Sequence, residues 1–361
     1  MLPLNWQRVR LGDIAEIKRG VRITKNELDV FGKYPVVSGG VGFLGYTNNF
    51  NRYENTITIA QYGTAGYVNF QKNKFWANDV CFCIYPNKDI IKNIFLYYFL
   101  KVNQNYLYEI SNRNATPYSI SKDKILDFEI LLPPLNEQSA IANILSGLDR
   151  YLCALDALIL KKEGVKKALS FELLSQRKRL KGFNQAWQKV RLGDICEITT
   201  GSLDANEMVH YGKYRFYTCA KEYYFIDKYA FDTEAILISG NGAYVGYVHY
   251  YKGKFNAYQR TYVLDNFSEH IIFVKYFLTM FLQSHIQANR NEGNTPYIVM
   301  ATLKDFEILL PPLNEQSAIA NILSGLDNEI TSLKNKKRQF ENIKKALNHD
   351  LMSAKIRVLE K

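Results

Sequence analysis

Several features of membrane, secreted and metal-dependent proteins are missing from this sequence. No apolar run reaches the ~18 residues that a membrane-spanning helix needs. The first residues, MLPLNWQRVRLGD, lack the apolar core of a signal peptide. The five cysteines form no CxxC pair and no metal-binding array with the five histidines. These absences favour a reduced, cytosolic chain without a metal site.

Motifs of common active sites are also scarce. The sequence has no P-loop, no HExxH and no GxSxG. GVGFLG (Gly40 to Gly45) fits GxGxxG, but turn-like residues follow it where a nucleotide site needs a helix. TPY, at Thr116 and again at Thr295, lacks the first proline and polar lead residue of an amino-methyltransferase motif, and a turn explains it better. We therefore expect a non-catalytic chain without a cofactor of its own.

The charge balance points towards a polyanionic partner. The net charge is +11, and Lys and Arg that neutralise phosphates supply most non-specific affinity for nucleic acids. The 26 tyrosines and 21 phenylalanines suit nucleotide stacking, although we expect most of them in the core. A merely basic soluble protein remains the alternative.

The whole chain is a tandem repeat. DFEILLPPLNEQSAIANILSGLD runs from Asp127 to Asp149 and again, unchanged, from Asp305 to Asp327. WQRVRLGDIAEIKRG returns as WQKVRLGDICEITTG, and GKY, GYV and TPY return in order at similar offsets. Recent duplication or exchange within the gene explains the identity, and so does a surface that must meet one partner twice. Both explanations stay open.

Each copy predicts the same order of elements. VRLGDI alternates like a strand, and ENTITIA and TEAILIS are further β-prone runs. Helical periodicity follows in DIIKNIFLYYFLKV and HIIFVKYFLTMFL. In DFEILLP, Phe128, Ile130 and Leu132 alternate inward, and the double proline ends that strand.

A long helix is expected after each double proline. Asn136 is a plausible N-cap, and Glu137 suits the first turn. An apolar stripe with steps of three and four residues continues for about forty residues, through Ile141, Ile144, Leu148, Tyr151, Leu155, Leu158, Val165 and Leu169. Such a stripe is too long for one small domain to bury, so the two helices should pair as a coiled coil. The basic segment QRKRLKGFNQ between the halves either contacts phosphates or is a solvated helix end.

Each copy opens with a WQxVRLGDI strand, and LPPLNEQSAIANIL follows its globular part, or head. This arrangement resembles the specificity subunit of type I restriction–modification systems. The resemblance covers essentially the whole chain. It implies an α+β fold with two similar α/β target-recognition domains and two long helices in an antiparallel coiled coil. The implied segments are residues 1–133, the first recognition domain; 134–181, the first helix and basic linker; 182–311, the second recognition domain; and 312–361, the second helix.

The resemblance also implies the partners. Each head would read one half of a split target in double-stranded DNA, and the helices would set the gap. Two methyltransferase subunits would bind, and it stays open whether two restriction subunits join them. S-adenosylmethionine, and ATP and Mg for restriction, would belong to those partners and not to this chain.

Two sets of residues follow from this resemblance. Loops that differ between the heads should read different bases. The candidate DNA-contacting residues are Arg19, Arg22, Lys25, Ser38, Gln61, Tyr62, Arg113, Thr200, Lys221, Asn241, Tyr244, Gln259, Arg260 and Arg290. The candidate docking residues for the methyltransferase subunit are Asn136, Glu137, Gln138, Ser139, Asn143, Asn314, Glu315, Gln316, Ser317 and Asn321.

Two other functions remain compatible with the letters. A methyltransferase with an unrecognised site would bind S-adenosylmethionine in the isolated chain. A coiled-coil adaptor with two protein-binding heads would bind DNA weakly and independently of salt. The specificity subunit instead predicts salt-sensitive binding to a split, asymmetric target whose half-site centres lie roughly one helical turn, ~34 Å, apart.

Overall fold

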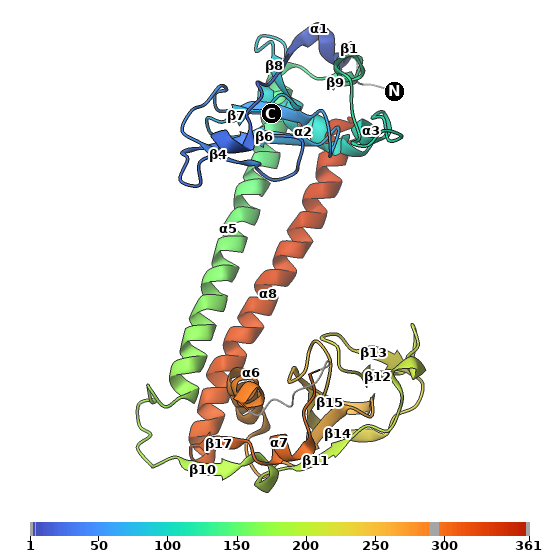
Figure 1. Ribbon diagram of the computed structural model, residues 1–361. Helices are drawn as coiled ribbons and strands as arrows, with labels where there is room; N and C mark the ends of the chain where they lie inside the picture. The colour runs from blue at the N-terminus through green and yellow to red at the C-terminus, as the bar shows by residue number, and fades with distance from the viewer. Residues whose placement is uncertain (1–2, 4, 289–295, 359–361) are drawn as a thin grey trace. The chain divides into compact units, whose positions relative to one another are not determined.

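A computed structural model describes residues 3, 5–288 and 296–358, which form two units (Figure 1). The first unit contains the chain up to Asp156 together with the part from Asn335 onward, and the second runs from Ala157 to Lys334. Two helices of 40 residues each, α5 (Leu135–Leu174) and α8 (Leu313–Met352), contribute one part to each unit. We call the remainder of each unit its head.

The described part of the first head has small sheets and short helices. Its sheets are the pair β1-β9, the four-stranded order β2-β8-β5-β6 and the three-stranded order β4-β3-β7. The strands are β1 (Gln7–Arg10), β2 (Ala15–Arg19), β3 (Tyr34–Val37), β4 (Gly45–Thr47), β5 (Thr56–Ala60), β6 (Val68–Gln71), β7 (Trp76–Ala77), β8 (Cys81–Pro86) and β9 (Glu129–Leu132). The helices are α1 (Leu11–Ile14), the 3-10 turn η1 (Lys25–Glu27), α2 (Asn93–Val102), α3 (Gln104–Glu109) and α4 (Lys122–Leu126).

The second head repeats this order, and some of its elements are longer. Its described strands form the pair β10-β17 and one six-stranded sheet of order β11-β16-β14-β15-β12-β13. They are β10 (Gln188–Arg191), β11 (Glu197–Thr200), β12 (Tyr214–Tyr217), β13 (Tyr224–Ile226), β14 (Phe231–Ser239), β15 (Val248–Ala257), β16 (Thr261–Asp265) and β17 (Glu307–Leu310). The helices are η2 (Leu192–Asp194), η3 (Ala205–Glu207), α6 (Ile271–Ala288) and α7 (Met300–Lys304).

One strand accounts for the difference in sheet number. In the second head, β15 continues for ten residues and pairs with β14 on one side and β12 on the other. In the first head, the corresponding stretch is divided into β6, which pairs with β5, and β7, which pairs with β3. The two heads therefore share one topology, and the expected mixture of helix and sheet is confirmed.

The strand before each long helix alternates as predicted. Phe128, Ile130 and Leu132 are buried, while Glu129 between them is exposed. β9 pairs antiparallel with β1, and Val9 of β1 lies opposite Ile130 of β9. Because proline has no N–H to donate, the double proline ends this ladder.

The expected N-cap of α5 was wrong by two positions. The helix begins at Leu135, and the carbonyl of Pro134 accepts the first helical hydrogen bond, from the N–H of Gln138 at 2.9 Å. Asn136 thus lies within the first turn, as does Glu137. A proline directly before the first helical residue is compatible with this start, because no N–H is lost from the helix.

Within each unit the two long helices run antiparallel. In the first unit the rings of Tyr151 and Phe340 pack at 4.8 Å, and Lys337 pairs with Asp156 at 2.6 Å. In the second unit Lys162 pairs with Glu329 at 2.8 Å. The predicted antiparallel pairing is therefore confirmed.

The apolar seam differs in part from the predicted stripe. Leu145, Leu155 and Ile159 are buried, whereas Ile144, Leu158 and Val165 are 38–46% exposed. Adjacent apolar residues, such as Ile144 with Leu145, offer two registers to a period of 3.6, and only packing decides between them.

Candidate nucleic-acid interface and partner surface

Three loops of the first head meet at the ends of its strands. The N–H of Thr64 donates to the carbonyl of Gly39 at 2.9 Å, and the N–H of Gly63 donates to the carbonyl of Tyr118 at 3.0 Å. These bonds join the loop after β3, the loop after β5 and the loop before α4. We call this set the first loop cluster.

Four predicted DNA-contacting residues lie in this cluster or beside it. Ser38 accepts a hydrogen bond from Asn78, and Gln61 and Tyr62 lie on the loop after β5. The guanidinium of Arg113 stacks over the rings of Tyr108 and Tyr118, at 5.1 and 4.7 Å. Stacking holds the Arg113 side chain in place, while most of its donors stay open on an exposed surface.

The other three candidates of the first head lie at the end of β2 and on the segment that follows it. Arg19 ends β2 and donates through Nε to the carbonyl of Asp79. Arg22 and Lys25 are exposed farther along, between β2 and β3. Contact of all seven residues with DNA stays a prediction.

The second head forms the equivalent cluster with different side chains. The carbonyl of Arg260 accepts hydrogen bonds from the N–H of Gly240 at 2.8 Å and from Sγ of Cys219 at 3.3 Å. The N–H of Gly242 donates to the carbonyl of Pro296 at 2.9 Å, and Lys221 lies over the ring of Tyr244 at 5.1 Å. We call these loops the second loop cluster.

The structure places most of the predicted residues of this head in the same cluster. Asn241 pairs with Tyr297 in an isolated bridge, and Gln259 donates through its N–H to Leu203. Thr200 is exposed at the end of β11. Arg290 lies outside the described residues. DNA contact by this set is likewise untested.

Sequence reasoning missed a histidine that holds a loop of the second cluster. Nε2 of His249 lies 2.9 Å from the carbonyl of Ala220. Because a carbonyl only accepts, this contact requires a proton on Nε2. Burial lowers the pKa of His249, so the neutral ring with its proton on Nε2 fits the site.

A second missed group is the aromatic setting of Arg215. Its guanidinium lies 4.2 Å from the ring centre of Tyr223 and 4.4 Å from that of Tyr251. The first head has Pro35 at the corresponding place in its β3 strand. The two heads thus differ in chemistry on a shared scaffold.

The identical block turns its glutamate and glutamine side chains inward. Glu137 and Glu315 are 5% and 0% exposed, and Gln138 and Gln316 are 0% exposed. Oε1 of Gln138 accepts from the N–H of Lys92, and its Nε2 donates to the carbonyl of Pro133. These four residues, predicted for docking, are engaged inside their own units, where they anchor each head to its helix.

Each buried glutamate also binds an arginine beyond the end of the other long helix. Arg179 makes two hydrogen bonds with Glu315, at 3.2 and 2.6 Å, and Trp187 donates a third at 3.2 Å. Arg357, Trp6 and Glu137 repeat this arrangement in the first unit. Arg179, in the basic linker that follows α5, therefore completes the second unit, and contact of this linker with phosphates stays a prediction.

The exposed part of the block is smaller than predicted. Asn136 and Asn143, with Asn314 and Asn321 in the second copy, are exposed, and Ser139 and Ser317 are bonded to helix carbonyls. Ile144, which the sequence reasoning assigned to the seam, and its counterpart Ile322 are each 38% exposed. We call Asn136, Asn143 and Ile144, with their counterparts Asn314, Asn321 and Ile322, the block faces. Docking at these faces stays a prediction.

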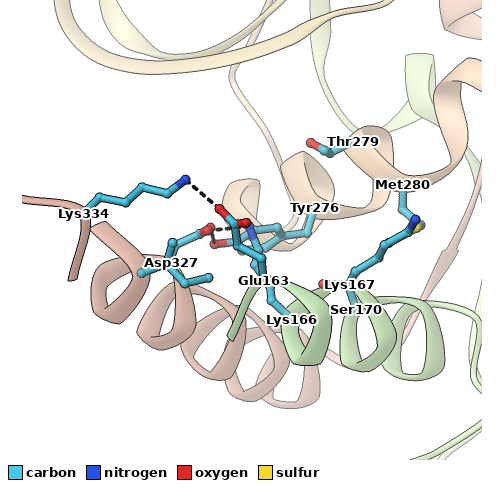
Figure 2. A pocket seen from close by; sticks show the side chains of 10 residues that line it. Glu163, Lys166, Lys167, Ser170, Tyr276, Thr279, Met280, Asp327 and Lys334 are labelled. Carbon is cyan, nitrogen blue, oxygen red and sulfur yellow. Dashed lines mark hydrogen bonds and ion pairs between the residues drawn. The ribbon is translucent and has the colours of Figure 1, made fainter. Parts of the chain in front are cut away.

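A tyrosine, an aspartate and a lysine join each head to both long helices. In the second unit the hydroxyl of Tyr276 donates to Asp327 at 2.6 Å, and Lys166 pairs with the same carboxylate (Figure 2). Tyr98, Asp149 and Lys344 repeat the triad in the first unit. Burial raises the pKa of Tyr276 and of Tyr98, and the neighbouring carboxylates raise them further.

A cavity of about 340 Å³ lies beside the triad of the second unit. Lys167, Ser170, Thr279 and Met280 line it, and Lys334 pairs with Glu163 across one side (Figure 2). In the first unit Lys101 occupies the position of Thr279 and reaches the carbonyl of Val68 at 2.9 Å. The two units thus share the triad, and they differ in the side chain that lies beside it.

Within residues 3, 5–288 and 296–358, no helix is both long and apolar enough to cross a membrane. In the same ranges no three His, Cys, Asp or Glu side chains are grouped to hold a metal ion.

The sequence profile described as "Type I restriction modification DNA specificity domain" matches the chain twice, at residues 3–162 and 184–342. The specificity subunit of the type I restriction enzyme EcoDI from Escherichia coli is 39% identical over 162 residues, which are 44% of this chain and 35% of that subunit. The putative type I specificity subunit S.MgeORF438P of Mycoplasma genitalium is 25% identical over 324 residues, 84% of this chain and 82% of that protein. This chain thus matches about a third of the first relative's length and most of the second's.

The fold resembles solved structures as well. The crystal structure of a type I restriction–modification S subunit from M. genitalium matches with a TM-score of 0.74 and 22% identity, over 97% of this chain and 98% of that one. A chain from a structure on complex assembly and conformational transition of the type I restriction–modification system matches with a TM-score of 0.56 and 17% identity, over 98% of both chains. At these identities the likeness concerns the fold.

Proposed function

Because the chain belongs to the family of type I restriction–modification DNA specificity domains, with one such domain in each half, we propose that each loop cluster reads one half of a bipartite, gapped target in double-stranded DNA. The long helices set the gap between the half-sites. This chain supplies recognition, and catalysis belongs to its partners.

One observation carries the proposal: the two heads have the same scaffold and different loop chemistry. The first cluster presents Ser38, Gln61 and the stacked Arg113, where the second presents Lys221 and Tyr244. Different donors and acceptors on equivalent loops select different base edges. A target read by these two clusters is therefore asymmetric, with a different sequence in each half.

The block faces are where two methyltransferase subunits dock, one on each copy. The buried Glu137 and Glu315, with their arginines, hold the two faces in the same local geometry. An identical partner requires an identical surface, and the faces are identical in sequence because they lie in the repeated block. Restriction subunits, where the cell makes them, join the same complex.

The cofactors follow the partners. S-adenosylmethionine belongs to the methyltransferase subunits, and ATP and Mg belong to the restriction subunits. The match of recognition domains to residues 3–162 and 184–342 supports this division, because it assigns most of the chain to DNA recognition. We place the complex in the cytoplasm, and the five unpaired cysteine thiols are in keeping with a reducing compartment.

The decisive experiment maps methylated DNA motifs in cells with and without this gene. We expect one gapped, asymmetric motif to disappear when the gene is deleted and to return when it is restored. Arg113→Ala should then weaken or relax recognition in one half only. A methylome that is the same in both cells would overturn the proposal.

The composition of the complex is a separate test. Mass measurement of the co-purified complex should give two methyltransferase subunits for each chain. A single partner subunit, or methyl transfer by this chain alone, contradicts the proposed division of labour.

A further inference from the structure

One nearly fully exposed aromatic side chain stands at the same turn of each head. Phe31 is 93% exposed and Tyr211 is 94% exposed, and each is followed by the same three residues, Gly, Lys and Tyr. Val30 beside Phe31 is 90% exposed. Isolated exposed apolar residues are common, but one at the same turn of two divergent heads points to a common partner.

The turn that carries Phe31 is firmly held. The N–H of Phe31 donates to Oδ1 of Asp29 at 2.8 Å, and the N–H of Asp29 donates to the carbonyl of Tyr46 at 2.8 Å. A Cβ on Gly32 would lie 2.5 Å from the backbone nitrogen of Thr47, so only glycine fits there. The ring is thus presented by a fixed backbone.

The turn of Tyr211 is held by the corresponding backbone contacts. The N–H of Val209 donates to the carbonyl of Phe225 at 2.9 Å, which is the counterpart of the bond from Asp29 to Tyr46. A Cβ on Gly212 would lie 2.6 Å from the backbone nitrogen of Ile226. The geometry of the turn has therefore been kept while its sequence has changed.

A pair of rings and a lysine follow each turn. In the first head the rings of Tyr34 and Phe50 lie 5.1 Å apart, and Nζ of Lys74 lies 4.5 Å from the ring centre of Phe50. Lys33 is exposed beside them, with Nζ 5.4 Å from the ring centre of Tyr34. Cation–π contact orders a lysine while its N–H groups stay available to an anion.

The second head repeats this cluster at the corresponding positions. The rings of Tyr214 and Tyr229 lie 5.0 Å apart, and Nζ of Lys254 lies 4.6 Å from the ring centre of Tyr229. Lys213 is exposed, and Asp232 is 3.9 Å from Lys254. We call Phe31, Lys33, Tyr34, Phe50 and Lys74, and their counterparts in the second head, the aromatic–lysine patches.

The repetition indicates which feature of DNA the patches meet. Side chains that read bases must differ between heads that read different half-sequences, whereas the two patches are alike. Phosphates and sugars are common to both half-sites. Lysines neutralise phosphates, and aromatic rings pack against the apolar carbons of sugars, so this combination suits binding that is tolerant of sequence.

We propose that each aromatic–lysine patch binds the DNA without reading its sequence, with Lys33 and Lys213 on phosphates and Phe31 and Tyr211 packed against sugars. This inference rests on the proposed function, and it separates the residues that hold DNA from the loop clusters that select it. A methyltransferase subunit is the other partner common to both heads, and the test distinguishes the two.

The test uses the complex of this chain with its methyltransferase subunits and two duplexes, one with the mapped motif and one unrelated. The charge variant is Lys33→Ala with Lys213→Ala, and the ring variant is Phe31→Ser with Tyr211→Ser. Lys161→Ala and Leu160→Ser are the matched controls, since both residues are exposed on α5. All four substituted head residues are exposed, so the variants should fold, which circular dichroism and melting can check.

We expect the slope of log affinity against log salt to become less negative by about 2 in the charge variant, since each lost phosphate contact contributes ~0.9. The ring variant should weaken binding about tenfold, since it removes the apolar packing of two rings. In both cases the two duplexes lose affinity by the same factor, the methylated motif stays the same, and the controls bind as the unmodified complex does.

Three results overturn the inference. A changed motif would make these residues base readers, and loss of methyltransferase from the complex would make the patch a protein-binding surface. Unchanged affinity and salt dependence would show that the patch does not touch DNA. Specific binding by the unmodified complex, measured in the same series, tests the proposed function separately.

Discussion

Arg357 and Glu137 lie 220 positions apart in the chain, and their side chains make two hydrogen bonds, at 3.1 and 2.8 Å. The glutamate is 5% exposed and also accepts from Nε1 of Trp6. A residue near the end of the chain thus completes the unit that contains its beginning. Arg179 does the same for the second unit from the middle of the chain.

Arg357→Met should therefore destabilise the first unit, because it leaves a buried carboxylate without its cation. We expect the melting temperature to fall by several degrees. Arg177→Met is the matched control, since that arginine packs on Phe171 and does not reach a buried carboxylate. Equal melting temperatures for the two variants would show that the pair contributes nothing.

Tyr276→Phe should destabilise the second unit by about 1.5–2 kcal/mol, since it removes a hydrogen bond to the ionised Asp327. This loss of stability is at the lower end of the range for a hydrogen bond to a charged group, because the site is partly open to solvent. Urea unfolding measures it, and Tyr211→Phe, which removes the hydroxyl of an exposed ring, should have no effect. Equal losses in the two variants would contradict the role of the triad.

The carboxylate of Asp327 should give the second unit a pH dependence. Burial acts to raise its pKa, but hydrogen bonds from Lys166 and Tyr276 outweigh burial, so the pKa lies below the ordinary value. Because the folded pKa is below that of the unfolded chain, ~3.9, the stabilisation is present above that pH and is lost as the pH falls through the folded pKa. Stability measured between pH 6 and 2 should fall less steeply in Asp327→Asn, and parallel curves would refute this.

Gly20→Ala should be strongly destabilising, by about 1–3 kcal/mol or more. A Cβ there would lie 2.0 Å from the carbonyl oxygen of Asn78, which is backbone and cannot move aside cheaply. Gly147→Ala is the matched control, because its Cβ would meet nothing within 4 Å and alanine favours the helix. Thermal melts should move in opposite directions for the two variants.

The two long helices, which are proposed to set the gap, can be lengthened without disturbing either unit. Seven residues inserted after Asp156 in α5 and seven inserted after Lys334 in α8 add two helical turns at the boundaries between the units. The added ~10.5 Å should widen the gap of the methylated motif by about three base pairs and leave both half-sequences alone. Exchange of Trp6–Leu132 for Trp187–Leu310 should instead change one half-sequence and keep the gap. A helix insertion that changes a half-sequence, or a head exchange that changes the gap, would contradict these separate roles of helices and heads.

The sequence by itself determined the duplication, the order of elements in each copy and the family. Repeated letters at a steady offset need no structure to be seen, and alternation in DFEILLP and helical spacing after the double proline are local patterns. The resemblance to type I specificity subunits is confirmed by the profile that matches both halves. The candidate DNA-contacting residues were chosen only because they lie in loops that differ between the heads, and their contact with DNA stays a prediction.

Only the tertiary structure decided which way the repeated block faces. Glu137 and Gln138 read as surface residues, because charged and amide side chains are mostly exposed. They are buried because Trp6, Lys92 and Arg357, remote in sequence, supply the partners that a buried polar group requires. The same holds for Ile144 and Leu145, since a local period allows either residue in the seam and only the packed partner helix selects one.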